Sequence, residues 1–254
     1  TTDMTLYLYL SNNNPGEAFT SIEIASTKHL FNCLGSSVDS SRKNVTIQNI
    51  TLKYSTNHAM NFSFSENFTI TGCEIAWIGG SYIPDSTSRY GNAIQFWRYA
   101  DNCTVENNYI YQIYDAAVTF QGSYDNIYTN LRFNNNLIEY CSMNFEFWAS
   151  IDKSTPVFKN IDFSSNILRF GGYGFGGLQR EEKLNQAYIL AWPYTYDSGS
   201  FEYFSITNNT FDIANSYYIY ASSSTSSSIG INGNTYYRNV DSMHQFAYLS
   251  DTYA

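Results

Sequence analysis

The sequence is poor in charged residues and in proline, and it contains no long apolar run. Only 14% of its 254 residues are charged and 4 are proline, whereas 18% are aromatic. An aromatic content this high excludes an intrinsically disordered or collagen-like chain. No apolar stretch approaches the ~18 residues of a transmembrane helix, so we expect no membrane partner. The first residues also lack the basic and apolar regions of a secretion signal.

Positive charge is the scarcer sign. The chain has 13 Lys and Arg against 22 Asp and Glu, a net charge of −9. This balance argues against a nucleic-acid partner, because such binding needs basic residues that neutralise phosphates. Asn, Ser, Thr and Tyr take the place of the Lys and Glu that are usual on cytosolic surfaces. We therefore expect an extracellular or cell-surface protein.

Metal and cofactor signatures are also missing. The four cysteines are far apart, at Cys33, Cys73, Cys103 and Cys141. No CxxC pair and no neighbouring His accompanies them, so we expect buried free thiols and no zinc site. His29, His58 and His244 are too scattered to form a metal triad. The run from Gly172 to Gly177 matches GxGxxG but lacks a βαβ unit around it, so we expect no nucleotide cofactor.

An eight-residue repeat organises the chain. Its pattern is apolar-x-apolar-x-x-(Asn)-x-apolar, and it occurs as VTIQNITL (45–52), FTITGCEI (68–75), CTVENNYI (103–110), LRFNNNLI (131–138), IDFSSNIL (161–168), FSITNNTF (204–211) and IGINGNTY (229–236). In five of the seven copies the sixth residue is Asn, namely Asn108, Asn136, Asn166, Asn209 and Asn234. Asn tolerates a left-handed bend and can bond the same bend in the next layer. We therefore predict a ladder of stacked Asn side chains.

A second apolar segment follows each copy: AMNF (59–62), AIQF (93–96), AVTF (117–120), NFEF (144–147), AYIL (187–190), YYIY (217–220) and FAYL (246–249). Two short strands per repeat and few hairpin turns favour a solenoid over a β-sandwich. We predict an all-β fold, a right-handed single-stranded parallel β-helix of roughly seven to eight coils with two longer loops on one side. A single domain, 1–254, is expected to comprise an irregular first coil and cap (1–44) and regular coils (45–254).

The repeat resembles the pectate-lyase-like superfamily of right-handed parallel β-helix proteins. The Asn-turn copies carry this resemblance over nearly the whole chain, and RYGNAIQFW (89–97) and IYQIYDAAVTFQG (110–122) are similar to segments of bacterial β-helix proteins. The resemblance implies polysaccharide lyases, glycoside hydrolases or tailspike-type depolymerases as a class. The catalytic signatures of the lyases and polygalacturonases are not present, so the resemblance assigns no catalytic residue.

Two insertions predict where a binding site lies. The intervals 76–92 and 169–186 are longer than their equivalents and leave the coil at the same corner. Insertions in a stacked repeat gather on one face, which is often the binding face. Strand alternation predicts that Met60, Ile94, Val118, Phe145 and Tyr188, with Phe62, Phe96, Phe120, Phe147 and Leu190, point inward. The predicted outward set is Asn61, Gln95, Trp97, Thr119, Gln121, Asn144, Glu146 and Trp148, with Trp192 just beyond.

Aromatic rings beside amides and carboxylates suit a glycan, because sugars stack their apolar faces on rings. The predicted substrate-binding residues are Arg89, Asn92, Gln95, Trp97, Gln121, Asn144, Trp148, Trp192, Glu181 and Glu182. The Trp residues could instead pack under loops as a small satellite core. Arg89 could hold an acidic sugar group or could only pin its loop against Asp115.

Two carboxylates are the catalytic candidates. A carboxylate shielded by aromatic neighbours tends to have a raised pKa, which suits Glu146 as a general acid. Asp115 precedes the equivalent strand of the adjacent coil and is the proposed second acid, although either residue could be purely structural. Glu139 and Arg169, on adjacent coils, are instead expected to form an ion pair.

Three functions stay open at this stage. The first is a carbohydrate-active enzyme that cleaves a polysaccharide, with hydrolysis favoured over β-elimination because the expected site has outward acids but no cluster of Lys and Arg. The second is a glycan-binding or adhesive module without chemistry. The third is a structural segment of a trimeric fibre, or a piece of a larger parent chain.

Overall fold

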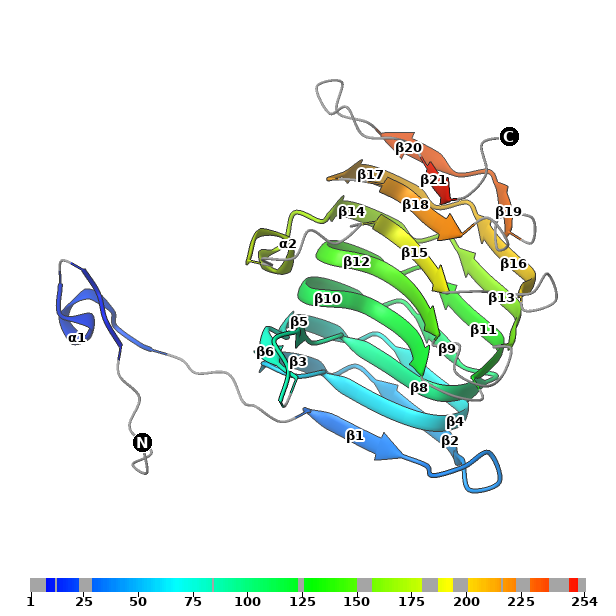
Figure 1. Ribbon diagram of the computed structural model, residues 1–254, viewed down its shortest axis with the longest axis horizontal. Helices are drawn as coiled ribbons and strands as arrows, with labels where there is room; N and C mark the ends of the chain where they lie inside the picture. Colours follow the sequence, from blue (N-terminus) through cyan, green and yellow to red (C-terminus); the bar gives the residue numbers. More distant parts are fainter. Residues whose placement is uncertain are drawn as a thin grey trace.

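The computed structural model is built almost entirely of parallel β-strands. It describes residues 8–11, 13–22, 29–83, 85–122, 126–149, 157–179, 187–193, 201–215, 217–222, 229–237 and 247–250. One large parallel sheet contains every strand except those of the short hairpin β6–β7. Its strands lie one above another from β1 to β20 and β21 (Figure 1). The all-β prediction is confirmed, and this pairing is consistent with a parallel β-helix.

The strands form three faces, each made of equivalent strands that pair in parallel with those of the next layer. Face 1 contains β1 (Phe31–Leu34), the first half of β4 (Met60–Thr71) and of β8 (Ile94–Asp101), the second half of β10 (Tyr109–Gly122) and of β12 (Leu137–Ala149), then β15 (Ala187–Pro193), β18 (Tyr217–Ser222) and β21 (Ala247–Ser250). Face 2 contains β2 (Arg42–Gln48), the second halves of β4 and β8, then β9 (Thr104–Glu106), β11 (Ile127–Asn134), β13 (Val157–Ser164), β16 (Phe201–Thr207) and β19 (Ile229–Asn232). Face 3 contains β3 (Thr51–Ser55), β5 (Glu74–Ile78), the first halves of β10 and β12, then β14 (Ile167–Gly171), β17 (Thr210–Ala214) and β20 (Thr235–Tyr237). Because β1 already pairs with β4, parallel pairing begins inside the segment 1–44.

The core is a column of phenylalanine rings between the faces. The register aligns the buried side chains of Phe62, Phe96, Phe120 and Phe147. The rings of Phe96 and Phe120 stack with centroids 5.0 Å apart and planes 3° apart. Full burial of a Phe side chain contributes about 1.5–3 kcal/mol. The predicted inward positions on β4, β8, β10 and β12 are therefore confirmed.

On β15 the predicted register is wrong by one residue. Ile189, not Tyr188, pairs with Phe145, and Leu190 pairs with Glu146. Tyr188 is nevertheless buried, and its hydroxyl donates to the Asp212 carbonyl at 2.5 Å. A buried tyrosine needs such a partner for its hydroxyl.

The predicted Asn ladder is present and buried. The Nδ2 groups of Asn108, Asn136, Asn166 and Asn209 each donate to the Oδ1 of the next Asn at 3.0 Å. Each also donates to a backbone carbonyl, as Asn136 does to Val105 at 2.9 Å. The left-handed backbone, however, is at the residue that precedes each ladder Asn in the chain: φ is 56° at Asn107 and 57° at Asn135. The ladder Asn thus supplies the bonds while its neighbour supplies the bend.

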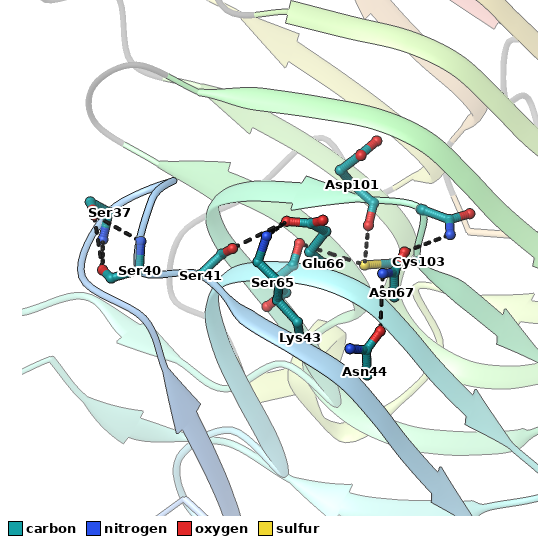
Figure 2. A network of polar contacts seen from close by, with 11 residues as sticks. Ser37, Ser40, Ser41, Lys43, Asn44, Ser65, Glu66, Asn67, Asp101 and Cys103 are labelled. Carbon is teal, nitrogen blue, oxygen red and sulfur yellow. Dashed lines mark hydrogen bonds and ion pairs between the residues drawn. The ribbon is translucent and has the colours of Figure 1, made fainter.

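A second column of Asn runs along the outside of face 2. Asn44, Asn67 and Asn102 are all left-handed and donate in sequence, Asn67 to Asn44 at 3.1 Å and Asn102 to Asn67 at 2.7 Å. Figure 2 shows Asn67 above Asn44, next to the carboxylate of Glu66 that Lys43 approaches to 2.6 Å. Polar contacts between coils therefore continue on the outside of the stack.

The two insertions lie on the same side of the stack (Figure 1). The first contains the antiparallel pair β6 (Ser81–Tyr82) and β7 (Arg89–Tyr90), and the second contains the short helix α2 (Phe175–Gln179). Phe175 lies against Trp77 with ring centroids 6.2 Å apart. A Cβ on Gly174 would lie 1.9 Å from the Tyr140 carbonyl oxygen, so the GxGxxG run serves close packing.

The other short helix is α1 (Pro15–Ala18). None of the helices in the described ranges is long and apolar enough to cross a membrane.

The cysteines are free, as predicted. Cys73, Cys103 and Cys141 are buried and Cys33 is half-buried. Burial raises the pKa of the Cys103 thiol to about 12. The predicted ion pair between Glu139 and Arg169 is also present at 3.1 Å.

Candidate functional site

The outer side of face 1 carries the residues that the sequence singled out. Strand register places them in two rows that cross successive coils. The first row is Asn61, Gln95, Thr119 and Glu146, and the second is Ser63, Trp97, Gln121, Trp148 and Trp192. We refer to these as the amide row and the tryptophan row. Residues up to 131 positions apart in the chain, from Asn61 to Trp192, are thus brought to one face.

Hydrogen bonds between coils hold the amides in place. Asn61 Nδ2 donates to Asn32 Oδ1 at 3.0 Å, Gln95 Nε2 donates to Asn61 Oδ1 at 2.9 Å, and Gln121 Nε2 donates to Gln95 Oε1 at 3.0 Å. Because each amide has a second hydrogen on Nδ2 or Nε2, such a chain retains donors for a ligand. The side chains are oriented before a ligand arrives, which lowers the entropic cost of binding.

The tryptophan row has Trp at three of its five positions. Trp97 and Trp148 both pair with Gln121, which lies on the coil between them. They are therefore two coil steps apart, or about 10 Å at ~4.8 Å per coil. Both indoles are half-buried, so part of each ring faces solvent. Trp192 pairs with Trp148 one coil further on, but its side chain lies outside the described residues.

Glu146, the last member of the amide row, is almost buried. It is 8% exposed, and its Oε2 accepts a hydrogen bond from Thr119 Oγ1 at 2.7 Å. A carboxylate with so little solvent must be satisfied by neighbours or become protonated. Thr119 is fully buried, so it acts as a support for the carboxylate rather than as a ligand-binding group.

The structure does not bring Asp115 next to Glu146. The residue paired with Glu146 is Thr119, four positions after Asp115. Four residues along a strand span about 13 Å, whereas retaining and inverting pairs need ~5 Å and ~6.5–9.5 Å. Asp115 lies instead beside the end of the first insertion, where its N–H donates to the Gly91 carbonyl at 3.2 Å. Glu181 and Glu182, the other predicted acids, lie outside the described residues.

Two predicted ligand-binding residues, Asn144 and Asn92, are interior, and a third, Gln95, is only 8% exposed. Asn144 is 0% exposed and its Nδ2 donates to the Ile138 carbonyl at 3.4 Å, so its predicted outward orientation is wrong. Just before this position the pairing shifts, because Ile113 to Ala116 on β10 spans one residue more than the paired Cys141 to Met143 on β12. Asn144 Oδ1 has no hydrogen-bond partner in the described part of the chain.

Asn92 is also buried and serves the backbone. Its N–H donates to His58 Nδ1 at 2.9 Å, and its Oδ1 accepts from the Ala116 N–H at 2.9 Å. Burial lowers the pKa of His58 to about 3, with a smaller contribution from His29, so the imidazole stays a neutral acceptor. Asn92 Nδ2 also donates to Gln95 Oε1 at 3.2 Å, which links this corner to the amide row.

Arg89 is bound within its own hairpin. Its guanidinium donates to the Tyr82 hydroxyl at 3.0 Å and lies 4.6 Å from the centroid of that ring. Tyr82 in the β6–β7 hairpin is a partner that the sequence did not indicate, and the predicted contact of Arg89 with Asp115 stays a prediction. A cation–π contact of this kind contributes about 0.5–1 kcal/mol at an exposed site.

Sequence reasoning missed two supports of the site. Tyr128 donates from its hydroxyl to the Gln121 carbonyl at 2.6 Å, and complete burial raises its pKa well above the usual value. Asn32 ends the amide chain but lies in the segment for which no regular coil was predicted. Asn32 can be identified only from the pairing of β1 with β4, and β1 lies before the first copy of the sequence repeat.

The described residues contain no cluster of three or more His, Cys, Asp or Glu that could hold a metal ion. Comparison of the chain with protein-family models, curated proteins and solved structures gave no match. The geometry of face 1 is therefore the basis for a functional proposal.

Proposed function

We propose that the chain is a right-handed parallel β-helix of seven to eight coils, of the pectate-lyase-like type, that binds a polysaccharide on face 1. The observation that carries the proposal is the alternation Trp97, Gln121, Trp148 on adjacent coils, beside an amide row whose members are already hydrogen-bonded. Indole rings offer flat apolar surfaces to sugar rings, and amides bond hydroxyls. An exported protein on or outside the cell would meet such a ligand.

The arrangement fits a polymer that lies along the stack. One coil step of about 4.8 Å is close to the length of one hexose, so a chain of sugars would meet the rings of Trp97 and Trp148 with one residue between them. The net charge of −9 favours a neutral polymer over a polyanion.

Affinity electrophoresis tests this proposal with neutral polysaccharides (xylan, galactomannan and mixed-linkage β-glucan) in the gel. Loss of both rings in Trp97→Ala with Trp148→Ala should weaken retention at least tenfold, or about 1.4 kcal/mol. Tyr203→Asn is the matched control, because Tyr203 is an exposed ring on face 2 with a left-handed backbone that Asn tolerates. Equal retention of the wild type and the double variant would contradict binding on face 1.

Hydrolysis of the bound polysaccharide is the second candidate, and Glu146 favours it. A nearly buried carboxylate beside the tryptophan row, which accepts a hydrogen bond from Thr119 Oγ1, has the surroundings of a general acid. Its partner acid would be Glu181 or Glu182, because Asp115 lies four residues along the strand from the position that pairs with Glu146. Reducing-sugar release that disappears in Glu146→Gln, with retention in the gel unchanged, would establish the enzyme. Binding without release in the wild type would leave a glycan-binding module.

A further inference from the structure

A column of aromatic side chains follows the edge of face 3 where each coil turns toward face 1. Strand register places Tyr54, Trp77, Tyr140 and Phe170 on one line, together with Gln112 and Ile213. The backbone is left-handed at all six, with φ between 51° and 65°. We name the four rings the aromatic column.

Left-handed backbone is unfavourable for a bulky side chain, by about 1–2 kcal/mol, whereas Asn and Gly tolerate it. Two other left-handed columns mostly follow this preference: one is Asn44, Asn67, Asn102, Asn130 and Asn160, ending in Tyr203, and the other is Asn49, Gly72, Asn107, Asn135, Ser165, Asn208 and Gly233. Phe64 and Arg98 are separate left-handed exceptions. The aromatic column departs from it on four coils. Repeated backbone strain at equivalent positions is a reason to look for a function there.

The rings are accessible and almost continuous. The side chains of Tyr54 and Trp77 are 50% and 43% exposed. Tyr140 and Phe170 stack with centroids 4.7 Å apart. One coil has Gln112, which carries no ring, at the equivalent position. There the second insertion supplies Phe175, whose ring centroid lies 6.2 Å from that of Trp77 and whose N–H donates to Gln112 Oε1 at 3.3 Å. A ring is thus present at nearly every coil.

Hydrogen-bonding groups line the column, and their charges are paired. The residues that precede the left-handed positions include Lys53, Glu139, Arg169 and Asp212. Lys53 contacts Glu74 at 2.5 Å, and Arg169 contacts Glu139 at 3.1 Å and Asp212 at 3.5 Å. The Lys53–Glu74 and Arg169–Asp212 pairs are partly exposed and add little stability, whereas Glu139 is only 8% exposed. Together these pairs leave a polar border with little net charge. A neutral ligand with hydroxyl groups suits such a border better than an anion.

We propose that the aromatic column is a second carbohydrate-binding surface, which takes a neutral polysaccharide lying along the stack. The column stands on a different edge from the tryptophan row, so the two surfaces act separately. Tyr54 and Trp77, the two exposed rings, lie one coil step of about 4.8 Å apart, which is close to the length of one hexose. Tyr140 and Phe170 stack on each other and extend the column. The proposal does not depend on binding or hydrolysis at face 1.

The test exploits the left-handed backbone. In Tyr54→Asn with Trp77→Asn, the new side chains suit the conformation, so the melting temperature should stay equal or rise. Retention by xylan, galactomannan or mixed-linkage β-glucan, measured in the Trp97→Ala, Trp148→Ala background, should fall at least tenfold. Ile213→Asn is the matched control, because it changes the same column without removing a ring. Polygalacturonate serves as the anionic comparison and should retain neither protein.

Three results would overturn the proposal. Unchanged retention in the Tyr54→Asn, Trp77→Asn variant would show that these rings bind no glycan. A clear fall in melting temperature would show that they serve folding. A change from dimer to monomer by sedimentation velocity, with no effect on retention, would make the column an interface between copies of the chain. Failure of the face 1 proposal alone would appear as full retention in the Trp97→Ala, Trp148→Ala background.

Discussion

Removal of one side chain from the middle of the buried Asn ladder should destabilise the protein far more than removal at its end. Asn136 Oδ1 accepts from the Asn108 N–H at 3.1 Å, and Asn136 Nδ2 donates to the Val105 carbonyl at 2.9 Å. Asn136→Ala would leave both backbone groups without these partners. Each buried unsatisfied group costs about 1–3 kcal/mol, so we expect a loss of about 4 kcal/mol. That is a large share of the 5–15 kcal/mol typical of a folded protein.

Urea unfolding followed by circular dichroism measures this loss as a lower midpoint at unchanged m-value. Asn234→Ala is the matched control, since Asn234 ends the ladder and is half-buried, and its Oδ1 accepts from the Asn209 N–H at 2.8 Å. Water can reach that end and replace the lost bond, so about 1 kcal/mol is expected there. If the two variants lose equal free energy, the ladder is not the device that holds the coils in register.

Two further predictions concern titratable side chains. His58 has a folded pKa of about 3 against 6.5 when unfolded, so its stabilising effect is complete above pH 6.5 and is lost as the pH falls toward 3. Between pH 6.5 and pH 4 the wild type should lose about 3 kcal/mol more than His58→Asn, which keeps an acceptor for the Asn92 N–H, in paired urea titrations; equal losses would refute the assignment. Iodoacetamide at pH 8 should label Cys33 alone in the native protein, as judged by peptide mass, because Cys103 has a pKa of about 12 and is buried with Cys73 and Cys141. Rapid native labelling of Cys103 would show that the coils open readily.

The ladder was predictable from sequence, but the bend beside it was not. Five copies of the repeat have Asn at the same position, which indicates that equivalent positions align in successive layers. Asn136 was therefore expected to contact Asn108 and Asn166. Where two Asn are adjacent, as at Asn107 and Asn108, either could adopt the left-handed backbone. The copies with Gly72 and Gly233 at the earlier position hold the missing signal, because glycine marks the left-handed residue.

The site was harder to predict because it depends on register between strands. Matching AYIL to NFEF placed Tyr188 level with Phe145, whereas matching Trp192 to Trp148 would have given the observed pairing of Ile189 with Phe145. Strict alternation also failed at Asn144, which is interior. A bulge adds one residue to one strand, and every inward or outward assignment that assumes even spacing across it becomes unreliable.

In a stack of coils the surroundings of a side chain come mostly from the coils above and below. Glu146 receives its hydrogen bond from Thr119, 27 residues earlier, and Gln95 connects Asn61 to Gln121 across three coils. A ligand that lies along the stack would meet residues of a column rather than of a segment. Variants made in columns, such as Trp97 with Trp148, therefore test a binding surface, whereas variants of chain neighbours alter an outward residue and an inward one together.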